Sequence, residues 1–350
     1  MSENITIRTP EPNTVSLAEK VSFLRKPASY PHPVSKVETK ETHMSWVFLA
    51  DDYVYKLKKP VQYHFLDFRA IEARYKNCEA EITINKRLAN DIYVGIVPLV
   101  INEKGKLAID GSGEIIDWLV KMKRIAEINF LDFTIANNLI DFIKLEETAK
   151  LLADFYINAP GIQVSPDEYM RKLEDEMIFS HDELRKHDFQ LSDSLIEKLF
   201  ATLKNFIKSH TALFVDRIEK GKIIEAHGDL RPEHICLPPQ PAIIDALEFN
   251  RELRVMDIAE ELSFLDMECE MIGNTQVGEH FISTYKLRSG DEIPDLLLFF
   301  YKAKKAFLRT YLVARHVTEA DYKEDPKWLR KANAYLQLSG KYTNLIRENT

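Results

Sequence analysis

The hydrophobic pattern divides the chain into three parts. Residues 1–36 are mostly polar, contain several prolines and hold one short segment with helical spacing. Between residues 37 and 123, aromatic and β-branched residues alternate with polar ones, which predicts strands. From residue 124 onward, apolar residues recur at the spacing of amphipathic helices. We therefore predict an N-terminal extension with a short helix over 1–36, a sheet-rich domain over 37–123 and a helical domain over 124–350.

Five runs in the sheet-rich part have the length and composition of strands. They are residues 45–49, 53–58, 93–100, 106–109 and 115–122. Short turn-forming linkers join the first run to the second and the third to the fourth, as in hairpins. The stretch between Ala70 and Leu88 instead has helical spacing. The pattern thus indicates a five-stranded antiparallel sheet with one helix.

Amphipathic helices dominate the remainder of the chain. The clearest are predicted at residues 145–156, 168–179, 195–216 and 296–315. Their apolar stripes are typical of helices that pack on a core. The last of them also carries several basic residues, namely Lys302, Lys304, Lys305, Arg309 and Arg315. We expect this basic face to be solvated.

A group of ionisable residues lies between residues 227 and 247. Apolar runs flank Pro238-Pro239-Gln240-Pro241, which cannot continue a strand, so this segment is predicted to fold into a hairpin. A regular antiparallel register around that loop places His234 opposite Asp245, with Asp229 just upstream. Such oxygen and nitrogen ligands can hold a hard cation and leave one carboxylate as a base. An ordinary buried hairpin is the alternative interpretation.

Composition and charge narrow the class of protein. The chain has 350 residues, of which 45% are hydrophobic and 29% charged, as is usual for a globular protein long enough for two lobes. A net charge of −8 argues against nucleic-acid binding, which usually needs a basic face. The widely spaced Cys78, Cys236 and Cys269 predict buried, reduced thiols. The N-terminus has no apolar signal segment and no apolar run is long enough to span a membrane, so we predict a cytoplasmic protein.

The ionisable group resembles the catalytic and metal-binding loops of the aminoglycoside phosphotransferase superfamily of kinase-like enzymes. That pattern is His-Gly-Asp, a metal-binding Asn five residues after the Asp, and a second metal-binding Asp beyond a hairpin. His227-Gly228-Asp229 and Asp245 match it, whereas His234 stands in place of the Asn. The resemblance implies an α+β, two-lobed, protein-kinase-like fold with Asp229 as the catalytic residue. It also implies that Asp245 and His234 bind Mg²⁺. Mn²⁺ is possible in its place, because imidazole is a better ligand for Mn²⁺ than for Mg²⁺.

In a kinase-like fold, a strand lysine binds the nucleotide phosphates and a helix glutamate orients that lysine. Strand alternation places Lys56 and Lys58 on one face of the second predicted strand. Lys58 and Lys59 are interpreted as edge or surface residues. The resemblance implies that Lys56 binds the phosphates of ATP. Its partner on the following helix is expected to be Glu81, with Glu79 as the alternative.

The resemblance implies further nucleotide contacts. The turn Glu41-Thr42-His43-Met44-Ser45 stands where protein kinases carry a glycine-rich loop, so Thr42 and Ser45 would donate to the phosphates. The strand over 115–122 would lead into the hinge, where backbone groups around Lys121 and Met122 would contact the adenine. Asp257 is expected to cap a helix, and by resemblance also to brace the catalytic loop.

The resemblance covers about residues 40–320. Within the superfamily, the sequence resembles an uncharacterised bacterial branch that is often fused to a P-loop kinase domain. The P-loop motif Gly-x-x-x-x-Gly-Lys-Ser/Thr does not occur in this sequence. The resemblance implies ATP-dependent transfer of the γ-phosphoryl group to a hydroxyl of a small molecule. Two alternatives stay open: a catalytically degenerate nucleotide-binding regulator, and a kinase or AMP-transferase that acts on a protein. His-Asp pairs at 181–182 and 187–188 are weak signals for a metal phosphohydrolase, because no third ligand accompanies them.

Overall fold

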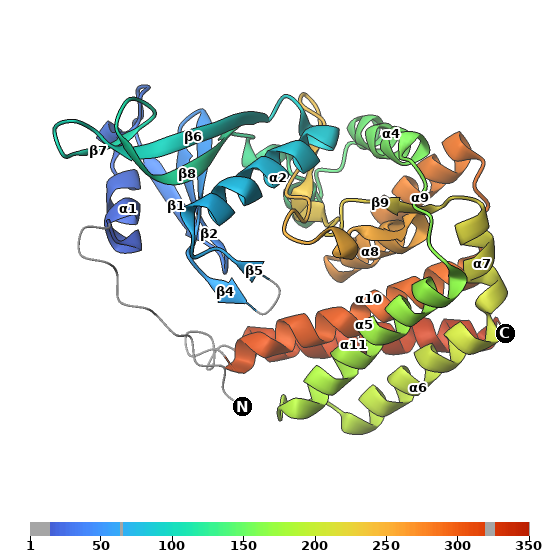
Figure 1. Ribbon diagram of the computed structural model, residues 1–350. Coiled ribbons are helices and arrows are strands. Elements are labelled where there is room, and N and C mark those ends of the chain that lie inside the picture. The colour runs from blue at the N-terminus through green and yellow to red at the C-terminus, as the bar shows by residue number, and fades with distance from the viewer. Residues whose placement is uncertain (1–14, 64–65, 319–325, 350) are drawn as a thin grey trace. The chain divides into compact units, whose positions relative to one another are not determined.

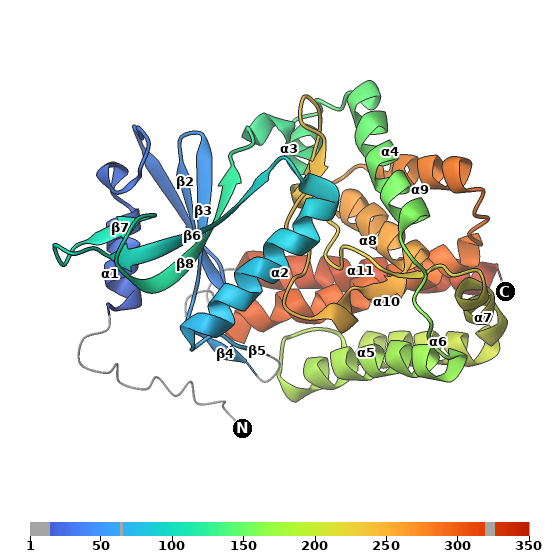
Figure 2. The same cartoon turned by 45° about the horizontal axis from the view of Figure 1, so that its top comes forward.

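The computed structural model describes residues 15–63, 66–318 and 326–349. The chain forms two compact units (Figures 1 and 2). Unit 1 consists of Met1–Glu127 and Ala242–Asn250, and unit 2 of Ile128–Pro241 and Arg251–Thr350. The first boundary lies close to the predicted one after residue 123. The segment Ala242–Asn250, which carries Asp245, belongs to unit 1 although the sequence analysis grouped it with the helical domain.

A six-stranded antiparallel sheet forms the centre of unit 1. Its strands, in spatial order, are β1 (Val37–Glu41), β2 (Ser45–Ala50), β3 (Tyr53–Lys58), β8 (Glu114–Lys123), β6 (Tyr93–Ile101) and β7 (Leu107–Ile109). Two short strands, β4 (Gln62–Tyr63) and β5 (Leu66–Asp67), pair with each other. The prediction of a five-stranded sheet was wrong because it did not include β1. This edge strand is mostly exposed and reads Val-Glu-Thr-Lys-Glu, so it lacks the apolar face that identifies a strand.

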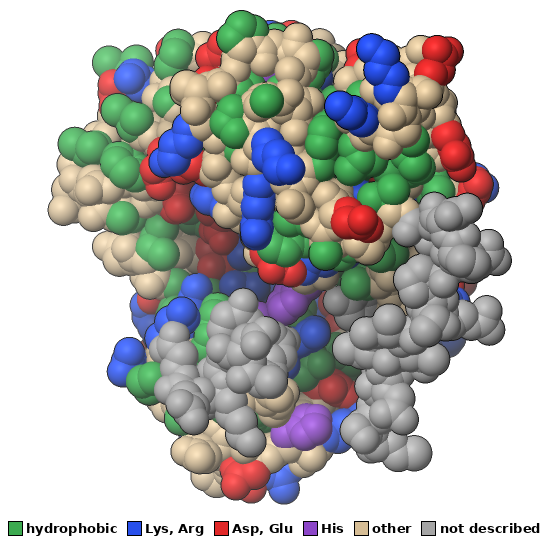
Figure 3. Space-filling model, turned by 90° about the vertical axis from the view of Figure 1, so that its left-hand side faces the viewer, with side chains coloured by type: hydrophobic (Ala, Val, Ile, Leu, Met, Phe, Trp, Pro, Cys, Tyr) green, Lys and Arg blue, Asp and Glu red, His purple; other side chains and the backbone are tan. Residues whose placement is uncertain are grey.

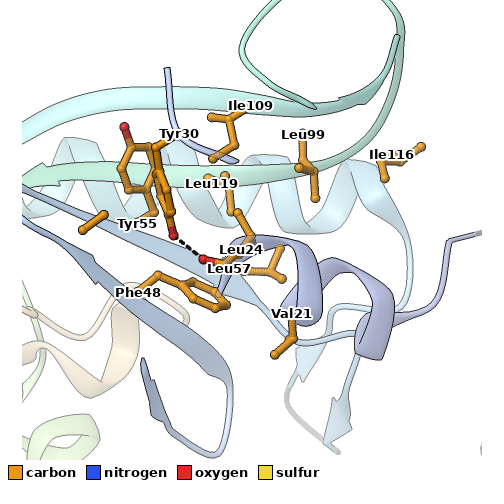
Figure 4. Packing of buried hydrophobic residues seen from close by; sticks show 11 residues of the cluster. Val21, Leu24, Tyr30, Phe48, Tyr55, Leu57, Leu99, Ile109, Ile116 and Leu119 are labelled. Atoms are coloured by element: carbon orange, nitrogen blue, oxygen red, sulfur yellow. Dashed lines mark hydrogen bonds between the residues drawn. The ribbon is translucent and has the colours of Figure 1, made fainter. Parts of the chain in front are cut away.

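The N-terminal extension contributes to the core of unit 1. Helix α1 (Leu17–Leu24) begins at Ser16, whose side chain forms a capping box with Glu19. Val21 and Leu24 of this helix lie in the same hydrophobic cluster as the sheet residues Phe48, Leu57 and Leu119 (Figure 4). The Tyr30 hydroxyl donates a hydrogen bond to the Leu24 carbonyl oxygen. Residues of the extension from Val15 onward are therefore part of this unit's hydrophobic core.

A buried carboxylate joins two helices to the sheet. Helix α2 (Ile71–Ala89) packs against β6 and β8 (Figures 1 and 2). Asp117 of β8 accepts hydrogen bonds from Arg74 Nε at 2.8 Å and from Lys20 Nζ at 2.7 Å. All three side chains are buried. Because Arg74 lies on α2 and Lys20 on α1, this network fixes both helices to the central strand β8.

Unit 2 is mainly helical. Its helices are α3 (Leu131–Ala136), α4 (Phe142–Asn158), α5 (Pro166–Lys186), α6 (Asp193–Ser209), α7 (Thr211–Glu219), α8 (Ile258–Met271), α9 (Thr275–Ser289), α10 (Asp295–Ala314) and α11 (Pro326–Glu348). Strands β9 (Ile223–Glu225) and β12 (Val255–Asp257) form an antiparallel pair. The helix predicted over 195–216 is two helices, because His210 at the junction has non-helical backbone angles. Strands β10 (Ile235–Cys236) and β11 (Ala242–Ile243) flank the four-residue loop of the predicted hairpin.

Of the basic residues of α10, Lys304 and Lys305 are buried and Lys302 and Arg309 are partly buried, so the expectation of a solvated basic face was wrong. Lys304 and Lys305 expose 4% and 7% of their surface, and their ammonium groups lie 2.8 and 2.9 Å from the Glu260 carboxylate. Lys302 forms an ion pair with Asp266, and Arg309 Nε lies 3.0 Å from Glu268 Oε1. Glu260, Asp266 and Glu268 belong to α8, and Lys304 also pairs with Glu176 of α5. A basic run alone therefore cannot distinguish a solvated face from one that faces a buried acidic helix.

The surface carries charges of both signs. On the face shown in Figure 3, Lys and Arg side chains lie interspersed with Asp and Glu and with hydrophobic side chains. Among the described residues, no helix is both long and apolar enough to cross a membrane. The three cysteines are buried, as predicted, and none of them forms a disulfide.

The close contact between α8 and α9 depends on a glycine. A Cβ atom at Gly278 would lie 2.3 Å from the Asp266 Cα, which is a backbone atom that cannot move aside. We therefore expect Gly278→Ala to lower the free energy of unfolding by about 1–3 kcal/mol, the usual cost of overpacking. The matched control is Gly340→Ala in α11, where the nearest atom is the Leu195 Cδ1 at 3.9 Å. Urea unfolding should show Gly340→Ala at or above wild-type stability, and equal losses in both variants would contradict this account.

Candidate functional site

Lys56 lies between two carboxylates in unit 1. Its ammonium group donates to Glu81 Oε1 at 3.0 Å and to Asp245 Oδ1 at 2.8 Å. Lys56 comes from β3, Glu81 from α2, and Asp245 from the segment after β11. Burial would lower the pKa of Lys56, but Asp245 and Glu81 outweigh it and hold this pKa well above its usual value. The arrangement therefore keeps a positive charge at a fixed position on the sheet.

The structure pairs Lys56 with Glu81 and not with Glu79. Glu81 is fully buried, and the positive charges of Lys56 and Lys58 outweigh its burial and lower its pKa. Glu79 instead forms a hydrogen bond with Tyr75, four residues earlier on the same helix, which raises the pKa of the tyrosine. Glu81, which the sequence analysis preferred to Glu79, thus has the geometry expected of a glutamate that orients a lysine.

Lys58 is the second cation of this group, and its interpretation as a surface lysine was wrong. Its side chain is 1% exposed and forms ion pairs with Glu81 and with Glu248, the latter at 2.5 Å. The neighbouring Lys59 is only partly exposed and pairs with Glu41 at 2.5 Å. Strand alternation correctly placed Lys56 and Lys58 on one face, but that face is buried by acidic residues distant in sequence.

The backbone around Asp245 is fixed by side chains of α2 and β6. Asp245 adopts a left-handed conformation with φ of 60°, which is unusual for a residue other than glycine. Its N–H donates to the Tyr93 hydroxyl at 3.2 Å, and the Ala246 N–H donates to Asn85 Oδ1 at 2.8 Å. The Asp245 side chain is 46% exposed. Strained backbone that is held by its surroundings is common at functional sites, and it presents this carboxylate to solvent.

The predicted phosphate loop is the tight turn between β1 and β2. The Thr42 N–H and hydroxyl both donate to the Ser45 carbonyl oxygen, at 2.8 and 3.0 Å. The Ser45 N–H in turn donates to the Thr42 hydroxyl oxygen at 2.9 Å. These hydrogen bonds close the turn on itself without a glycine. The role of Thr42 and Ser45 as phosphate donors stays a prediction.

The predicted hinge residues lie within the sheet. Lys121 pairs with Tyr55 of β3 and with Gly95 of β6, and Met122 is likewise paired on both sides. The Lys121 ammonium lies over the Tyr53 ring, 4.2 Å from its centroid. Contact of Lys121 and Met122 with an adenine stays a prediction.

Glu261 braces the loop that carries Asp229 in unit 2. Its carboxylate accepts hydrogen bonds from the His227 N–H at 3.1 Å and from the Gly228 N–H at 2.6 Å. The tight turn at Gly228, with φ of 89°, brings these two N–H groups together. Burial raises the pKa of Glu261. The sequence analysis missed this residue, although a helix-borne acid four residues after the cap residue Asp257 is a usable signal.

Asp257 caps α8, as predicted, and accepts a hydrogen bond from the Ala259 N–H at 2.8 Å. Both of its oxygens also accept hydrogen bonds from Arg217 Nε, at 3.1 and 3.0 Å. The Asp257 side chain thus contacts α7, α8 and Tyr301, whereas Glu261 contacts the loop that carries Asp229. The bracing role expected of Asp257 therefore falls to Glu261.

His234 is held by the same loop through both ring nitrogens. Nδ1 lies 2.8 Å from the Asp229 carbonyl oxygen and therefore donates to it. Nε2 lies 3.3 Å from Arg231 Nη2. Arg231 Nη2 also lies 3.0 Å from Asp229 Oδ2. A metal ion at Nε2 would have to replace the guanidinium group, so the role of His234 as a metal ligand stays a prediction. The predicted position of His234 opposite Asp245 also stays a prediction, because these residues belong to different units.

The charges around Asp229 keep it ionised at neutral pH. Burial would raise the pKa of Asp229, but the positive charge of Arg231, aided by His234 and Arg309, outweighs burial and lowers it. A carboxyl group with a lowered pKa contributes stability above its unfolded pKa and loses it as pH falls through the folded value. Any activity that needs this carboxylate should therefore persist into the acid range.

Removal of Arg231 should move this ionisation to higher pH. We expect Arg231→Met to raise the pKa of Asp229, because the nearby positive charge that lowers this pKa is lost. A ¹³C NMR titration of the labelled carboxyl groups would measure it. Lys220→Met, which removes an exposed lysine paired with Asp216, should leave the Asp229 titration unchanged. An unaltered midpoint in Arg231→Met would show that burial sets the pKa.

The donor set around Lys56 fits a hard cation better than the set around His234. Lys56 and Lys58 face three carboxylates, those of Glu81, Asp245 and Glu248, which leaves a formal excess of one negative charge. Asp245 offers exposed oxygen atoms, which Mg²⁺ prefers. Within the described part of the chain, no three His, Cys, Asp or Glu side chains converge as a ready metal-binding cluster.

Comparison with known proteins places this geometry in a known fold. No family model matches the sequence. Uncharacterized proteins of Mycobacterium tuberculosis and Mycobacterium bovis are 33% identical over 288 residues, which cover 79% of this chain and 55% of the relatives. The chain thus spans about half the length of the curated relatives that it matches.

Three solved structures have a similar fold. The GDP complex of an aminoglycoside 2'-phosphotransferase-IIIa mutant has a TM-score of 0.55 at 15% identity, over 93% of this chain and 98% of that one. Choline kinase of Cryptosporidium parvum has a TM-score of 0.55 at 10% identity, over 90% of each chain. A choline/ethanolamine kinase family protein of Mesorhizobium loti has a TM-score of 0.51 at 13% identity, over 94% and 99%.

These likenesses define the class of fold. The protein has the kinase-like fold of the aminoglycoside phosphotransferases and choline kinases, with an antiparallel sheet lobe and a helical lobe. The predicted fold class is confirmed, apart from the number of strands.

Proposed function

We propose that this protein transfers the γ-phosphoryl group of ATP to a hydroxyl group of a small molecule. The observation that carries the proposal is the position of Lys56, which is held by Glu81 of α2 and by Asp245 in unit 1. A strand lysine oriented by a helix glutamate is the arrangement with which kinase-like folds bind nucleotide phosphates. The solved structures with this fold include phosphotransferases and kinases that act on small molecules, which supports the proposal.

Each residue of the site would have a separate task. Lys56 would leave Asp245 and bind the nucleotide phosphates. Asp245 would hold Mg²⁺, which when bound neutralises charge on the phosphates. Asp229, which is 31% exposed and ionised, would orient the acceptor hydroxyl. The hydroxyl oxygen would bond to the γ-phosphorus as the bond to the β–γ bridging oxygen breaks. ADP would leave, and the hydroxyl proton would pass to Asp229.

A nucleotide-binding regulator without transferase activity is a second candidate. The observation that favours it is the contact of Arg231 with both Asp229 and His234, since it engages the base and the residue in the Asn position. A regulator would be stabilised by ATP against thermal unfolding without consuming it on any acceptor. A protein kinase or AMP-transferase would instead label a protein in a lysate, and γ- and α-labelled ATP would distinguish the two.

The proposal is tested first by ATP binding. We expect Lys56→Met to weaken ATP binding at least about tenfold, because a buried charge that contacts phosphate is lost. Isothermal titration with ATP and Mg²⁺ would measure the affinity. The matched control is Lys59→Met on the adjacent residue, which should bind like wild type.

A screen of metabolites for ATP consumption by the wild-type protein would then test transfer. Absence of ATP binding by the wild type would contradict both the transferase and the regulator. Binding without turnover across the screen would favour the regulator.

A further inference from the structure

A second buried ion pair lies beside Lys56, and the proposed reaction gives it no task. The Lys58 side chain is 1% exposed and that of Glu248 is 10% exposed. Their charged atoms lie 2.5 Å apart. Lys58 also contacts Glu81 Oε2, while Lys56 contacts Glu81 Oε1 at 3.0 Å. The single Glu81 carboxylate is thus shared between two lysines on the same face of β3.

The second pair also reaches the segment that carries Asp245. Glu248 follows Asp245 by three residues and is separated from Lys58 by 190 residues in sequence. Asp245 of this segment also forms an ion pair with Lys56, and the N–H groups of Asp245 and Ala246 donate neutral hydrogen bonds to Tyr93 and Asn85. The ion pair of Lys58 with Glu248 is therefore a charged contact between strand β3, which carries Lys56, and the segment that carries Asp245.

The charges around Glu81 explain why a lysine is useful at position 58. When ATP draws Lys56 toward its phosphates, Glu81 loses part of its neutralising charge, although it is fully buried. A buried carboxylate without a partner is costly, so Glu81 would either draw Lys56 back or move. Lys58 stays beside Glu81 because its other partner, Glu248, is not used by the nucleotide. One lysine is then free to change partners while the other stays in place.

We propose that Lys58 and Glu248 are positioning residues for the nucleotide and metal site: Lys58 fixes Glu81 while Lys56 engages the phosphates, and Glu248 fixes the segment that presents Asp245. This inference rests on the proposed function. It assigns different tasks to the two partners of one ion pair. Loss of Lys58 weakens the binding of ATP itself, whereas loss of the Glu248 charge weakens the use of Mg²⁺.

The two variants should therefore differ in what they change. Lys58→Met is expected to weaken ATP affinity about tenfold at saturating Mg²⁺, because Glu81 then competes with the phosphates for Lys56. Glu248→Gln is expected to raise the Mg²⁺ concentration for half-maximal ATP binding about tenfold, as is usual when a partner of a metal-binding group is lost. Its ATP affinity at saturating Mg²⁺ should stay within about threefold of wild type. The double variant should show both defects, because the two residues have different tasks.

The experiment is isothermal titration of ATP into the full chain at a series of Mg²⁺ concentrations. Lys59→Met and Glu103→Gln, both at exposed or partly exposed positions, serve as controls, and Lys58→Arg should restore most of the affinity. Thermal unfolding of each variant checks that it is folded. If Lys58→Met does not fold, the Mg²⁺ dependence of Glu248→Gln tests the inference. This variant should fold, because the Glu248 side chain is partly exposed.

Three results would overturn the inference, and they are distinguishable. If wild type binds ATP but Lys58→Met and Glu248→Gln match their controls, the positioning roles are wrong and the proposed function stands. If wild type does not bind ATP, the proposed function fails and the inference fails with it. Equal loss in both variants at every Mg²⁺ concentration would reduce the ion pair to a structural role.

Discussion

Replacement of Asp229 with alanine is expected to reduce phosphoryl transfer about a thousandfold, the usual effect of losing a general base, while ATP binding stays close to wild type. The reason is the position of Asp229 on a loop fixed by Glu261, with its carboxylate ionised and 31% exposed. None of the contacts that hold Lys56 involves this residue. The measurement is the rate of ATP consumption with an acceptor found in the metabolite screen, together with ATP affinity from titration.

The control for this experiment is a more exposed carboxylate that has no proposed task. Asp216 of α7 is exposed and pairs with Lys220 at 2.9 Å, so Asp216→Ala should retain full activity. Asp229→Asn adds a second comparison, because it keeps the size of the side chain and removes the base. Retention of activity in Asp229→Asn would contradict the role as base, and equal loss of binding and transfer in Asp229→Ala would indicate a damaged fold.

Replacement of Arg217 with alanine is expected to lower the free energy of unfolding by about 3–5 kcal/mol at neutral pH, because it removes one partner of a buried ion-pair network. Arg217 Nη2 lies 2.8 Å from Asp257 Oδ1, and Nη1 lies 2.6 Å from Asp291 Oδ1. All three side chains are at most 3% exposed. The substitution would leave the buried Asp257 carboxylate without its cation and Asp291 with only Lys222, whose ammonium group lies 3.7 Å away.

The destabilisation should decrease as the pH is lowered. Burial already raises the pKa of Asp257 with Arg217 present, and without the guanidinium group this pKa should rise further. A buried carboxyl group with a raised pKa is destabilising when ionised, and protonation relieves that cost. Urea unfolding at pH 8 and pH 5 would measure the difference. Arg288→Ala removes an exposed ion pair with Asp154 and should cost less than about 1 kcal/mol at either pH. Equal losses for both arginines would contradict this explanation.

Local pattern was sufficient for most elements of the fold. Alternation identified β2 and β3, and a capping signal preceded α1. The edge strand β1 was missed because its side chains are mainly charged and exposed. The break at His210 was missed because the apolar spacing of α6 continues into α7, and only the backbone angles end the helix. Such features depend on tertiary contacts that periodicity does not report.

The candidate site was predictable only where a residue has a local signal. Lys56 and Glu81 could be named because a predicted strand and the following helix offered a lysine and a glutamate for the roles that the family resemblance implies. The burial of Lys58 could not, since it depends on Glu248, which lies 190 residues later. Glu260 and Glu261 are adjacent in sequence but point to different partners, Lys304 and the Gly228 N–H, because consecutive helical residues face different directions. Only the structure shows which of the two reaches the catalytic loop.

The buried pairing of α8 with α10 restricts how this protein can be recombined with its relatives. Four cations of α10 contact acids of α8, and each of these acids is at most 6% exposed. A chimera that inherits only one of these helices from a divergent sequence would enclose charges without counterparts. The two helices should therefore be transplanted together, although residues 272–294 separate them in the sequence.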